Sequence, residues 1–293
     1  MPSVEFPSST IPWLWRKADI KWHEPENHEL KIRTIEKILS LRGGRRPTKQ
    51  SQPEIASLTP FTRNDKNNKD IKTIVTSFVQ YSTGFRQDLD ALSKIKGSRY
   101  FVLNATQGFG ALPIDVKRWK VDFLTTNSYK WLMGGYGGGI LYMNKKWVQK
   151  FKPSSAGWRS VENPGKMNNR NVDVRPEAAR YELGSPCFPV SFAMGAAIEY
   201  LSEIGMEKIE KRILEITDFA IQGLEKKGFE VISPRAPRHR SGIVVFKVKE
   251  PEKVRRRLLD KKIYTSVRGE GLRIAPHFYN SFEDIEKFLK ALA

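Results

Sequence analysis

Residues 103–142 read LNATQGFGALPIDVKRWKVDFLTTNSYKWLMGGYGGGILY, in which short apolar segments alternate with polar and glycine-rich connections. Similar β-branched and apolar segments precede this stretch, and segments of this length and composition predict buried strands. The predicted strands are Ile71 to Val79, Tyr100 to Leu103, Val121 to Thr125 and Gly139 to Met143. A helix is predicted from Asp88 to Ile95, between the first two strands. Short apolar strands with helical or looped crossovers predict an α/β fold, with a mainly parallel sheet sandwiched by helices.

Polar side chains follow two of these predicted strands, at the point where each strand ends. Asn104 and Gln107 come just after Leu103, and Lys130 comes soon after Thr125. Open α/β sheets bind ligands at the carboxyl ends of neighbouring strands, so we expect these side chains to share one crevice. The glycine run that follows allows the backbone to turn tightly and to approach a ligand or a partner chain. Its members are Gly134, Gly135, Gly137, Gly138 and Gly139.

The pattern changes after Ser185, where a second and smaller domain is predicted. A helix from Phe192 to Ile204 links the two domains, and a long helix follows from Met206 to Lys227. Short apolar segments and two further helices then predict an α+β domain. These segments are Phe229 to Ile232, Gly242 to Val248, Tyr264 to Val267 and Leu272 to Ala275, with helices at Glu250 to Lys261 and Phe282 to Leu292. We therefore expect a large domain at 1–205, which contains a polar loop or disordered insertion at 42–68, and a small domain at 206–293.

Charge and composition narrow the classes of function. The net charge of +19 is compatible with nucleic-acid binding,. However, most basic residues alternate with acidic ones on predicted helices, and the dense run is confined to Arg42–Lys49,. Nucleic-acid binding is therefore not expected as the main function. The single cysteine, Cys187, excludes an internal disulfide and a zinc site built on several thiolates, and no metal site is predicted,. No window approaches the roughly 18 apolar residues of a membrane span, and no secretory signal is seen, so a cytoplasmic protein is expected.

Seven motifs give the sequence a specific resemblance. They are EFPSSTIPW (5–13), VQYSTGFRQDL (79–89), NATQGFGALPIDV (104–116), SYKWLMGGYGGG (128–139), GWRSV (157–161), YELGSP (181–186) and GLRIAPHFYN (271–280). With these motifs the chain resembles the class V aminotransferase family of fold-type I pyridoxal-phosphate enzymes. That family also contains cysteine desulfurases, kynureninase and isopenicillin-N-epimerase-like proteins. The resemblance covers nearly the whole chain apart from the polar insertion, and it implies a homodimer.

The resemblance implies a set of cofactor-binding residues for pyridoxal 5'-phosphate. Lys130 matches the catalytic lysine that holds the cofactor as a Schiff base. Gln107 matches the residue that hydrogen-bonds the phenolic oxygen. Tyr129 and Asn127 match positions that reach the phosphate, and Phe6 matches the aromatic ring that stacks on the pyridine. In such enzymes the cofactor acts as an electron sink, while the protein supplies orientation and electrostatics.

Two further positions concern the substrate and the cofactor's electronics. Arg273 matches the arginine that binds the substrate carboxylate, for which a guanidinium fork is suited,. Asn104 stands where the family has an aspartate facing the pyridine nitrogen, and a neutral amide supports a protonated ring much less than a carboxylate does. The segment Val267 to Leu272 is short and has no cysteine, which argues against a desulfurase that uses a cysteine persulfide.

The predicted function is therefore a pyridoxal-phosphate enzyme that acts on an amino acid, with aminotransferase-type chemistry. Transamination, epimerisation and β-elimination all remain open. The EFPS-like motif lies almost at Met1, whereas family members begin well before it, so the part with the phosphate-binding turn is expected to be missing. The alternative hypothesis is accordingly a truncated, non-catalytic remnant, or one half of a split enzyme, that retains the fold.

Overall fold

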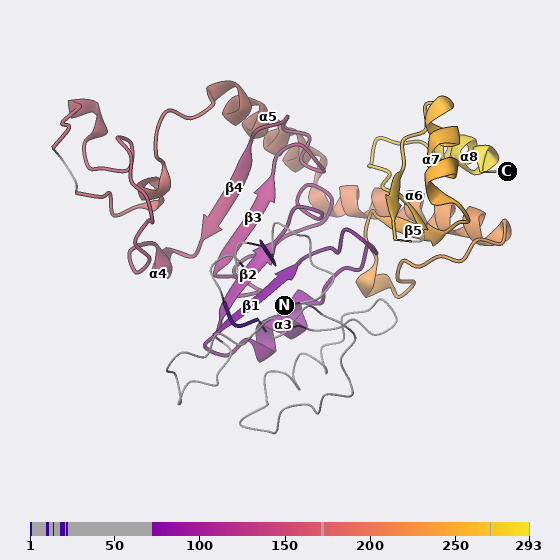
Figure 1. The fold of residues 1–293 in the computed structure, drawn as a ribbon, viewed down its shortest axis with the longest axis horizontal. Coiled ribbons are helices and arrows are strands. Elements are labelled where there is room, and N and C mark those ends of the chain that lie inside the picture. The colour runs from indigo at the N-terminus through magenta and orange to yellow at the C-terminus, as the bar shows by residue number, and fades with distance from the viewer. Residues whose placement is uncertain are drawn as a thin grey trace.

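The computed structural model describes residues 1, 10, 11, 14, 18–20, 22, 72–170, 173–269 and 271–292. Two sheets are seen in this part of the chain, one of four strands and one of three. Figure 1 shows the four-stranded sheet beside the smaller sheet and its helices, with the long helix α6 leading from one to the other. The predicted polar loop at 42–68 and Phe6 lie outside the described residues.

The four-stranded sheet has the strand order β1-β2-β3-β4. Its strands are β1 (Thr73–Ser77), β2 (Tyr100–Asn104), β3 (Phe123–Asn127) and β4 (Gly139–Met143). The first three strands are parallel, and β4 runs antiparallel to β3. The short glycine-rich link before β4 explains this reversal, because a parallel pair needs a longer crossover. The prediction of a mainly parallel α/β sheet is confirmed, with an antiparallel strand at its edge.

Local sequence explains where the first helices begin. Helix α3 (Leu89–Ile95) is capped by Asp88, whose Oδ1 accepts a hydrogen bond of 2.9 Å from the backbone nitrogen of Ala91,. Its buried leucines pack in one apolar cluster with Phe78, Phe101 and Leu103 of the sheet region. A short helix, α4 (Lys145–Val148), follows β4, and its cap is the side chain of Asn144. The chain then passes through the short 3-10 helices η1 (Pro164–Lys166) and η2 (Ala178–Tyr181) before α5.

The second half of the chain forms a small antiparallel sheet covered by helices. Its strand order is β5-β7-β6. The elements are α5 (Phe188–Ile204), α6 (Met206–Lys226), η3 (Pro237–His239), β5 (Val244–Lys247), α7 (Pro251–Asp260), β6 (Ser266–Arg268), β7 (Gly271–Ile274) and α8 (Phe282–Ala291). A reciprocal capping box between Ser281 and Asp284 begins α8,. The inner faces of α6 and α8 pack with the small sheet in a second apolar cluster.

Helix α6 contributes to both apolar clusters. Ile209 and Ile213 near its start belong to the cluster of the four-stranded sheet. Ile216 and Leu224, further along, belong to the cluster of the small sheet. The predicted division of the chain at residues 205 and 206 coincides with the glycine turn between α5 and α6, where Gly205 has a φ of 93°. The division itself remains a prediction, because one helix is shared by both cores.

Two predicted elements differ from the observed ones. Helix α5 begins at Phe188, earlier than the predicted Phe192, because Pro189 suits the first turn of a helix,. The segment from Phe229 to Ile232 does not form a strand of the small sheet. It makes a single antiparallel bridge to β5, between Val231 and Phe246, with backbone hydrogen bonds from Ile232 to Val245 and from Lys247 to Glu230 on either side.

Candidate active site

The carboxyl ends of β2 and β3 carry polar side chains on one face of the sheet. Phe101 and Leu103 of β2 are fully buried on the opposite face, so alternation turns Asn104 away from that core,. In the register, Asn104 lies beside Ser77 of β1 and Thr125 of β3. Asn127 lies two residues beyond Thr125 and therefore on the same face. The Oδ1 atom of Asn127 is buried and has no hydrogen-bond partner among the described residues.

The loop that carries Lys130 is shaped by Ser128. This serine is fully buried, and its hydroxyl lies 2.6 Å from the carbonyl oxygen of Gly135 and 2.9 Å from that of Gly138. The loop also packs tightly on its neighbours. A Cβ added at Gly110, where φ is 96°, would lie 2.5 Å from the carbonyl oxygen of Trp131. Glycine at this position therefore lets the loop after β2 approach the residue that follows Lys130.

Lys130 lies half-buried beside two arginines. Its Nζ is 5.9 Å from the ring centroid of Tyr129. Burial lowers the pKa of Lys130 below the ordinary 10.5, and the positive charges of Arg273 and Arg268 lower it further. Each of these effects disfavours the ammonium form of the lysine. A lower pKa raises the fraction of neutral amine, which is the form that can attack a carbonyl carbon.

The two arginines reach this place from the small sheet. Arg268 ends β6 and Arg273 lies in β7, and in the register of this antiparallel pair they fall on one face,. Arg273 Nη1 donates a hydrogen bond of 3.0 Å to the carbonyl oxygen of Tyr81, and the Arg268 guanidinium lies 5.5 Å from the ring centroid of Tyr81. Burial and the neighbouring Arg268 lower the pKa of Arg273 to about 10.

This arginine pair has no acidic counterpart in the part of the chain that the structure describes. None of the ion pairs among these residues includes Arg268 or Arg273. The Nε atom of Arg268 is also buried without a hydrogen-bond partner there. Buried cations normally have a partner, because removing an isolated charge from water is costly. The arrangement therefore favours an anionic ligand beside the Lys130 amine.

Residues beside the small sheet also hold a turn that follows β1 of the large sheet. The hydroxyls of Ser233 and Ser241 each donate a hydrogen bond of 2.6 Å, to the carbonyl oxygens of Thr83 and Gly84 respectively. These contacts hold the turn that contains Tyr81. The carboxyl edge of one sheet is therefore attached to the other by hydrogen bonds as well as by apolar packing.

His277 attaches the Lys130 loop to the small unit. Its Nδ1 lies 2.9 Å from the backbone nitrogen of Phe278, which can only donate, so Nδ1 must be the acceptor. Nε2 therefore carries the hydrogen and donates it over 3.0 Å to the carbonyl oxygen of Trp131. Burial lowers the pKa of His277, although the bond to Trp131 opposes this effect. Both ring nitrogens are thus engaged in holding structure.

Comparison with known proteins decides the family. The sequence profile of the aminotransferase class V family matches residues 64–288. The chain belongs to the class V aminotransferase family. It is 30% identical over 246 residues to an uncharacterized aminotransferase, YcbU, of Bacillus subtilis, covering 82% of this chain and 64% of YcbU. It is 29% identical to a probable cysteine desulfurase of Pyrococcus abyssi, covering 78% of this chain and 60% of that protein.

A solved structure shows the same fold. The apo structure of a cysteine desulfurase from Thermococcus onnurineus NA1 aligns with a TM-score of 0.82 and 23% sequence identity, covering 99% of this chain and 70% of that one. The family membership predicted from the motifs is confirmed. The chain spans less than two thirds of the length of YcbU and of the Pyrococcus abyssi protein.

The predicted site residues of this member of the class V aminotransferase family lie as follows. Lys130 and Arg273 are brought together, and Asn104 and Asn127 share one face at the adjoining sheet edge. Gln107 is half-buried in the loop that follows β2. Tyr129 is 41% exposed and stacks on Tyr136, with ring centroids 4.7 Å apart.

Arg268 is a site residue that the sequence analysis did not predict. Its signal lies in VRGEGLR, where two arginines flank a glycine-containing turn. In a tight antiparallel hairpin, that spacing places both side chains on one face. Pairing the two short apolar segments as a hairpin would therefore have found it.

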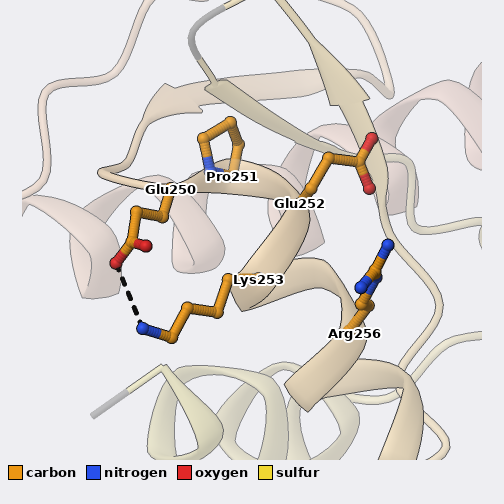
Figure 2. Close-up of a pocket in the computed structure, with 5 residues that line it drawn as sticks. All are labelled: Glu250, Pro251, Glu252, Lys253 and Arg256. Atoms are coloured by element: carbon orange, nitrogen blue, oxygen red, sulfur yellow. Dashed lines mark hydrogen bonds and ion pairs between the residues drawn. The ribbon is translucent and has the colours of Figure 1, made fainter.

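Other candidate sites in the described residues are weaker. Figure 2 shows a surface pocket at the start of α7, lined by Glu250, Pro251, Glu252, Lys253 and Arg256. Lys253 pairs there with Glu250 at 3.3 Å, both side chains are exposed, and the pocket shares no residue with the site at Lys130. No cluster of three or more potential metal ligands occurs among the described residues. None of the described helices combines the length and apolar character needed to cross a membrane.

Proposed function

We propose that this class V aminotransferase binds pyridoxal 5'-phosphate through Lys130 and acts on an amino acid, with aminotransferase-type chemistry. The observation that carries the proposal is the half-buried Lys130 amine beside Arg273, at the carboxyl ends of β2 and β3. When bound, this cofactor withdraws electrons from the α-carbon of an amino acid. The protein must supply a nucleophilic amine, anion-binding groups and hydrogen bonds in fixed positions.

The residues present fit the cofactor and its substrate. The lowered pKa of Lys130 favours the neutral amine that attacks an aldehyde carbon,. The same amine, when released, can move a proton at the substrate α-carbon. Arg273 has a guanidinium without a carboxylate partner among the described residues, and it can accept the substrate carboxylate bidentately. Arg268 adds a second positive charge to the same place.

The polar groups at the sheet edge complete the cofactor site. Asn127 has a buried amide oxygen without a partner in the described residues, so its amide can turn to donate to a phosphate oxygen,. Gln107 and Tyr129 are proposed to bind the phenolic oxygen and the phosphate, as the family resemblance implies. Phe6 is proposed to stack on the pyridine ring.

We also propose that the protein works as a cytoplasmic homodimer. Support comes from α5, which is apolar around most of its circumference and yet exposes Phe188, Phe192 and Tyr200. Tyr136, in the glycine-rich link before β4, is 81% exposed. Aromatic surface of this kind is typical of a site where another chain packs. Size-exclusion chromatography with light scattering would measure the assembly directly.

The decisive experiment is covalent trapping. Protein mixed with pyridoxal 5'-phosphate is reduced with borohydride, digested, and the labelled peptide is mapped by mass spectrometry. We expect the label on Lys130, and its loss in Lys130→Ala. The matched control is Lys145→Ala, which removes an exposed lysine and should leave the label in place. Equal labelling of wild type and Lys130→Ala, or no label at Lys130, would overturn the proposal.

A further inference from the structure

The orientation of the Asn104 amide is fixed by its own backbone. Its Oδ1 accepts a hydrogen bond of 3.0 Å from the backbone nitrogen of Thr106, two residues further along. A backbone N–H can only donate, so the atom that meets it must be the amide oxygen. The other polar end of the side chain is therefore the Nδ2 amino group, which can only donate.

Asn104 is half-buried at the carboxyl end of β2, and Lys130 follows the carboxyl end of the neighbouring strand β3. The positive charges of Arg273 and Arg268 act on Lys130 there. The buried carboxylate of the same sheet, Asp122, comes just before β3 begins and is held there by Lys96. Asp122 is thus at the opposite end of the sheet. A further cation at the carboxyl edge would be repelled by the lysine and the two arginines.

We propose that Asn104 keeps the pyridine nitrogen of the bound cofactor unprotonated, by donating an amide N–H to the nitrogen lone pair. This inference rests on the proposed function together with the family resemblance, by which the residue at position 104 faces the pyridine nitrogen. A carboxylate in this position would accept a hydrogen bond from a protonated nitrogen and stabilise its charge. The amide of Asn104 presents a donor, which can only pair with a nitrogen that still has its lone pair.

The consequence concerns the class of reaction. With its ring nitrogen unprotonated, the bound cofactor would withdraw fewer electrons, and reactions that depend most on this withdrawal, amino transfer among them, would be slowed most. Proton exchange at the substrate α-carbon, by contrast, takes place at the carbon that Lys130 serves. This inference therefore narrows the aminotransferase-type chemistry of the proposed function: among the reactions that the sequence leaves open, α-proton exchange and epimerisation are favoured and net amino transfer is slowed.

The test is the protonation state of the pyridine nitrogen, which is measured without any turnover. Protein loaded with cofactor that carries ¹⁵N in the ring is studied by nitrogen NMR at neutral pH. We expect the wild type to give the chemical shift of neutral pyridine, and Asn104→Asp to give that of pyridinium. The variant keeps an acceptor for the Thr106 N–H, so the local turn is preserved.

Asn144→Asp is the matched control. Asn144 makes the same kind of turn, with its Oδ1 accepting from the backbone nitrogen of Lys146 at 3.2 Å, and it caps α4 away from the site. This variant should leave the wild-type chemical shift unchanged. In deuterated water, Asn104→Asp should also raise the ratio of amino transfer to α-proton exchange by about tenfold or more, the gain expected from a charge-assisted bond.

The possible results separate the two proposals. A pyridinium signal from wild-type protein that carries the borohydride label on Lys130 would overturn the inference about Asn104 and leave the proposed function standing. A single chemical shift shared by Asn104→Asp and wild type would overturn the same inference. Absence of the label on Lys130 would overturn the proposed function, and the role of Asn104 with it. The wild-type measurement does not depend on the folding of any variant.

Discussion

The two ends of the four-stranded sheet each carry a lysine, buried at one end and half-buried at the other, in different electrostatic surroundings. Near the amino end of β3, Lys96 contacts the fully buried carboxylate of Asp122. That carboxylate also accepts hydrogen bonds from Trp147 Nε1 at 2.6 Å and from the backbone nitrogen of Phe101 at 2.9 Å. At the carboxyl end, Lys130 lies beside two arginines.

This difference distinguishes polar groups that stabilise the fold, at the amino end, from polar groups suited to bind a ligand, at the carboxyl end. At the amino end, burial alone would raise the pKa of Asp122, but hydrogen bonds from Lys96, Trp147 and Phe101 outweigh it and lower the pKa. At the carboxyl end, buried polar atoms of Asn127 and Arg268 have no partner in the described part of the chain. A satisfied buried charge stabilises the folded state, whereas an unsatisfied one requires an explanation such as a ligand.

The largest expected effect comes from removing the Asp122 carboxylate at the amino end of the sheet. Asp122→Asn should lower the free energy of unfolding by about 3–5 kcal/mol, because it leaves the buried Lys96 ammonium without its anionic partner,. Urea unfolding at neutral pH measures this change. The matched control is Asp90→Asn, which breaks an exposed pair with Arg118 and should cost less than about 1 kcal/mol,.

The pH dependence of the same pair has a definite sign. The pKa of Asp122 is lowered on folding, so its contribution to stability is complete above the ordinary value of 3.8 and is lost as the pH falls below it,. Asp122→Asn should lack this acid-dependent loss. Parallel acid sensitivity of wild type and variant would contradict the account of this end of the sheet.

A smaller effect is expected where the two regions are joined by His277. His277→Phe should lower the free energy of unfolding by about 1–3 kcal/mol, because the carbonyl of Trp131 loses its buried donor,. Since folding lowers the pKa of His277, the wild type should lose stability as the pH falls below 6.5,. Urea unfolding at several pH values should show that this loss is reduced in the variant.

Removing a charge at the carboxyl end of the sheet should change the free energy of unfolding far less than removing Asp122 at the amino end. Arg268→Met should change the free energy of unfolding by less than about 1 kcal/mol, because no carboxylate is left behind and repulsion with Arg273 is removed,. The same urea measurement, next to Asp122→Asn, makes the comparison direct. A loss of about 3 kcal/mol or more would show that Arg268 is part of a structural charge network.

The smallest expected effect is a shift in the pH at which Lys130 reacts at half of its maximal rate. Reductive methylation of Lys130 should reach half of its maximal rate below the ordinary lysine value of 10.5, and Arg273→Met should move this midpoint upward by removing a positive charge,. Mass spectrometry of the Lys130 peptide follows the reaction, with the exposed Lys117 in the same digest as reference. A midpoint that does not move, or moves downward, would rule out the coupling between Arg273 and Lys130.

The sequence predicts the elements of this fold well where the hydrophobic pattern is strong. The segment from Gly139 to Met143 forms a strand with the predicted bounds, and the helix predicted from Met206 ends within one residue of its expected end. The direction of β4 was not predicted, because apolar composition says nothing of strand polarity. The segment from Phe229 to Ile232 was predicted wrongly as a strand, because apolar composition does not say how many of its residues pair, and only Val231 forms a bridge.

The site was predictable in its chemistry but only partly in its geometry. The position of Lys130 after a strand, together with its motif, pointed to the carboxyl edge of the sheet. Arg268 required knowledge of the hairpin register, since it meets Lys130 only through the pairing of β6 with β7. The orientation of the Asn104 amide likewise depends on a backbone turn that the residue type alone does not specify. The roles of the individual site residues stay predictions, which trapping at Lys130 and nitrogen NMR would test.

Helix α6 has a consequence for how the molecule unfolds. The first turns of α6 lie in the apolar cluster of the four-stranded sheet, and its later turns lie in the apolar cluster of the small sheet. Unfolding either cluster would therefore also unfold part of α6, on which the other cluster depends. The stabilities of the two clusters are thus coupled through this shared helix. A cut at the turn of Gly205 would leave the cluster of the small sheet whole in the C-terminal fragment and would divide the cluster of the four-stranded sheet between the two fragments. The intact chain should therefore melt in one cooperative transition.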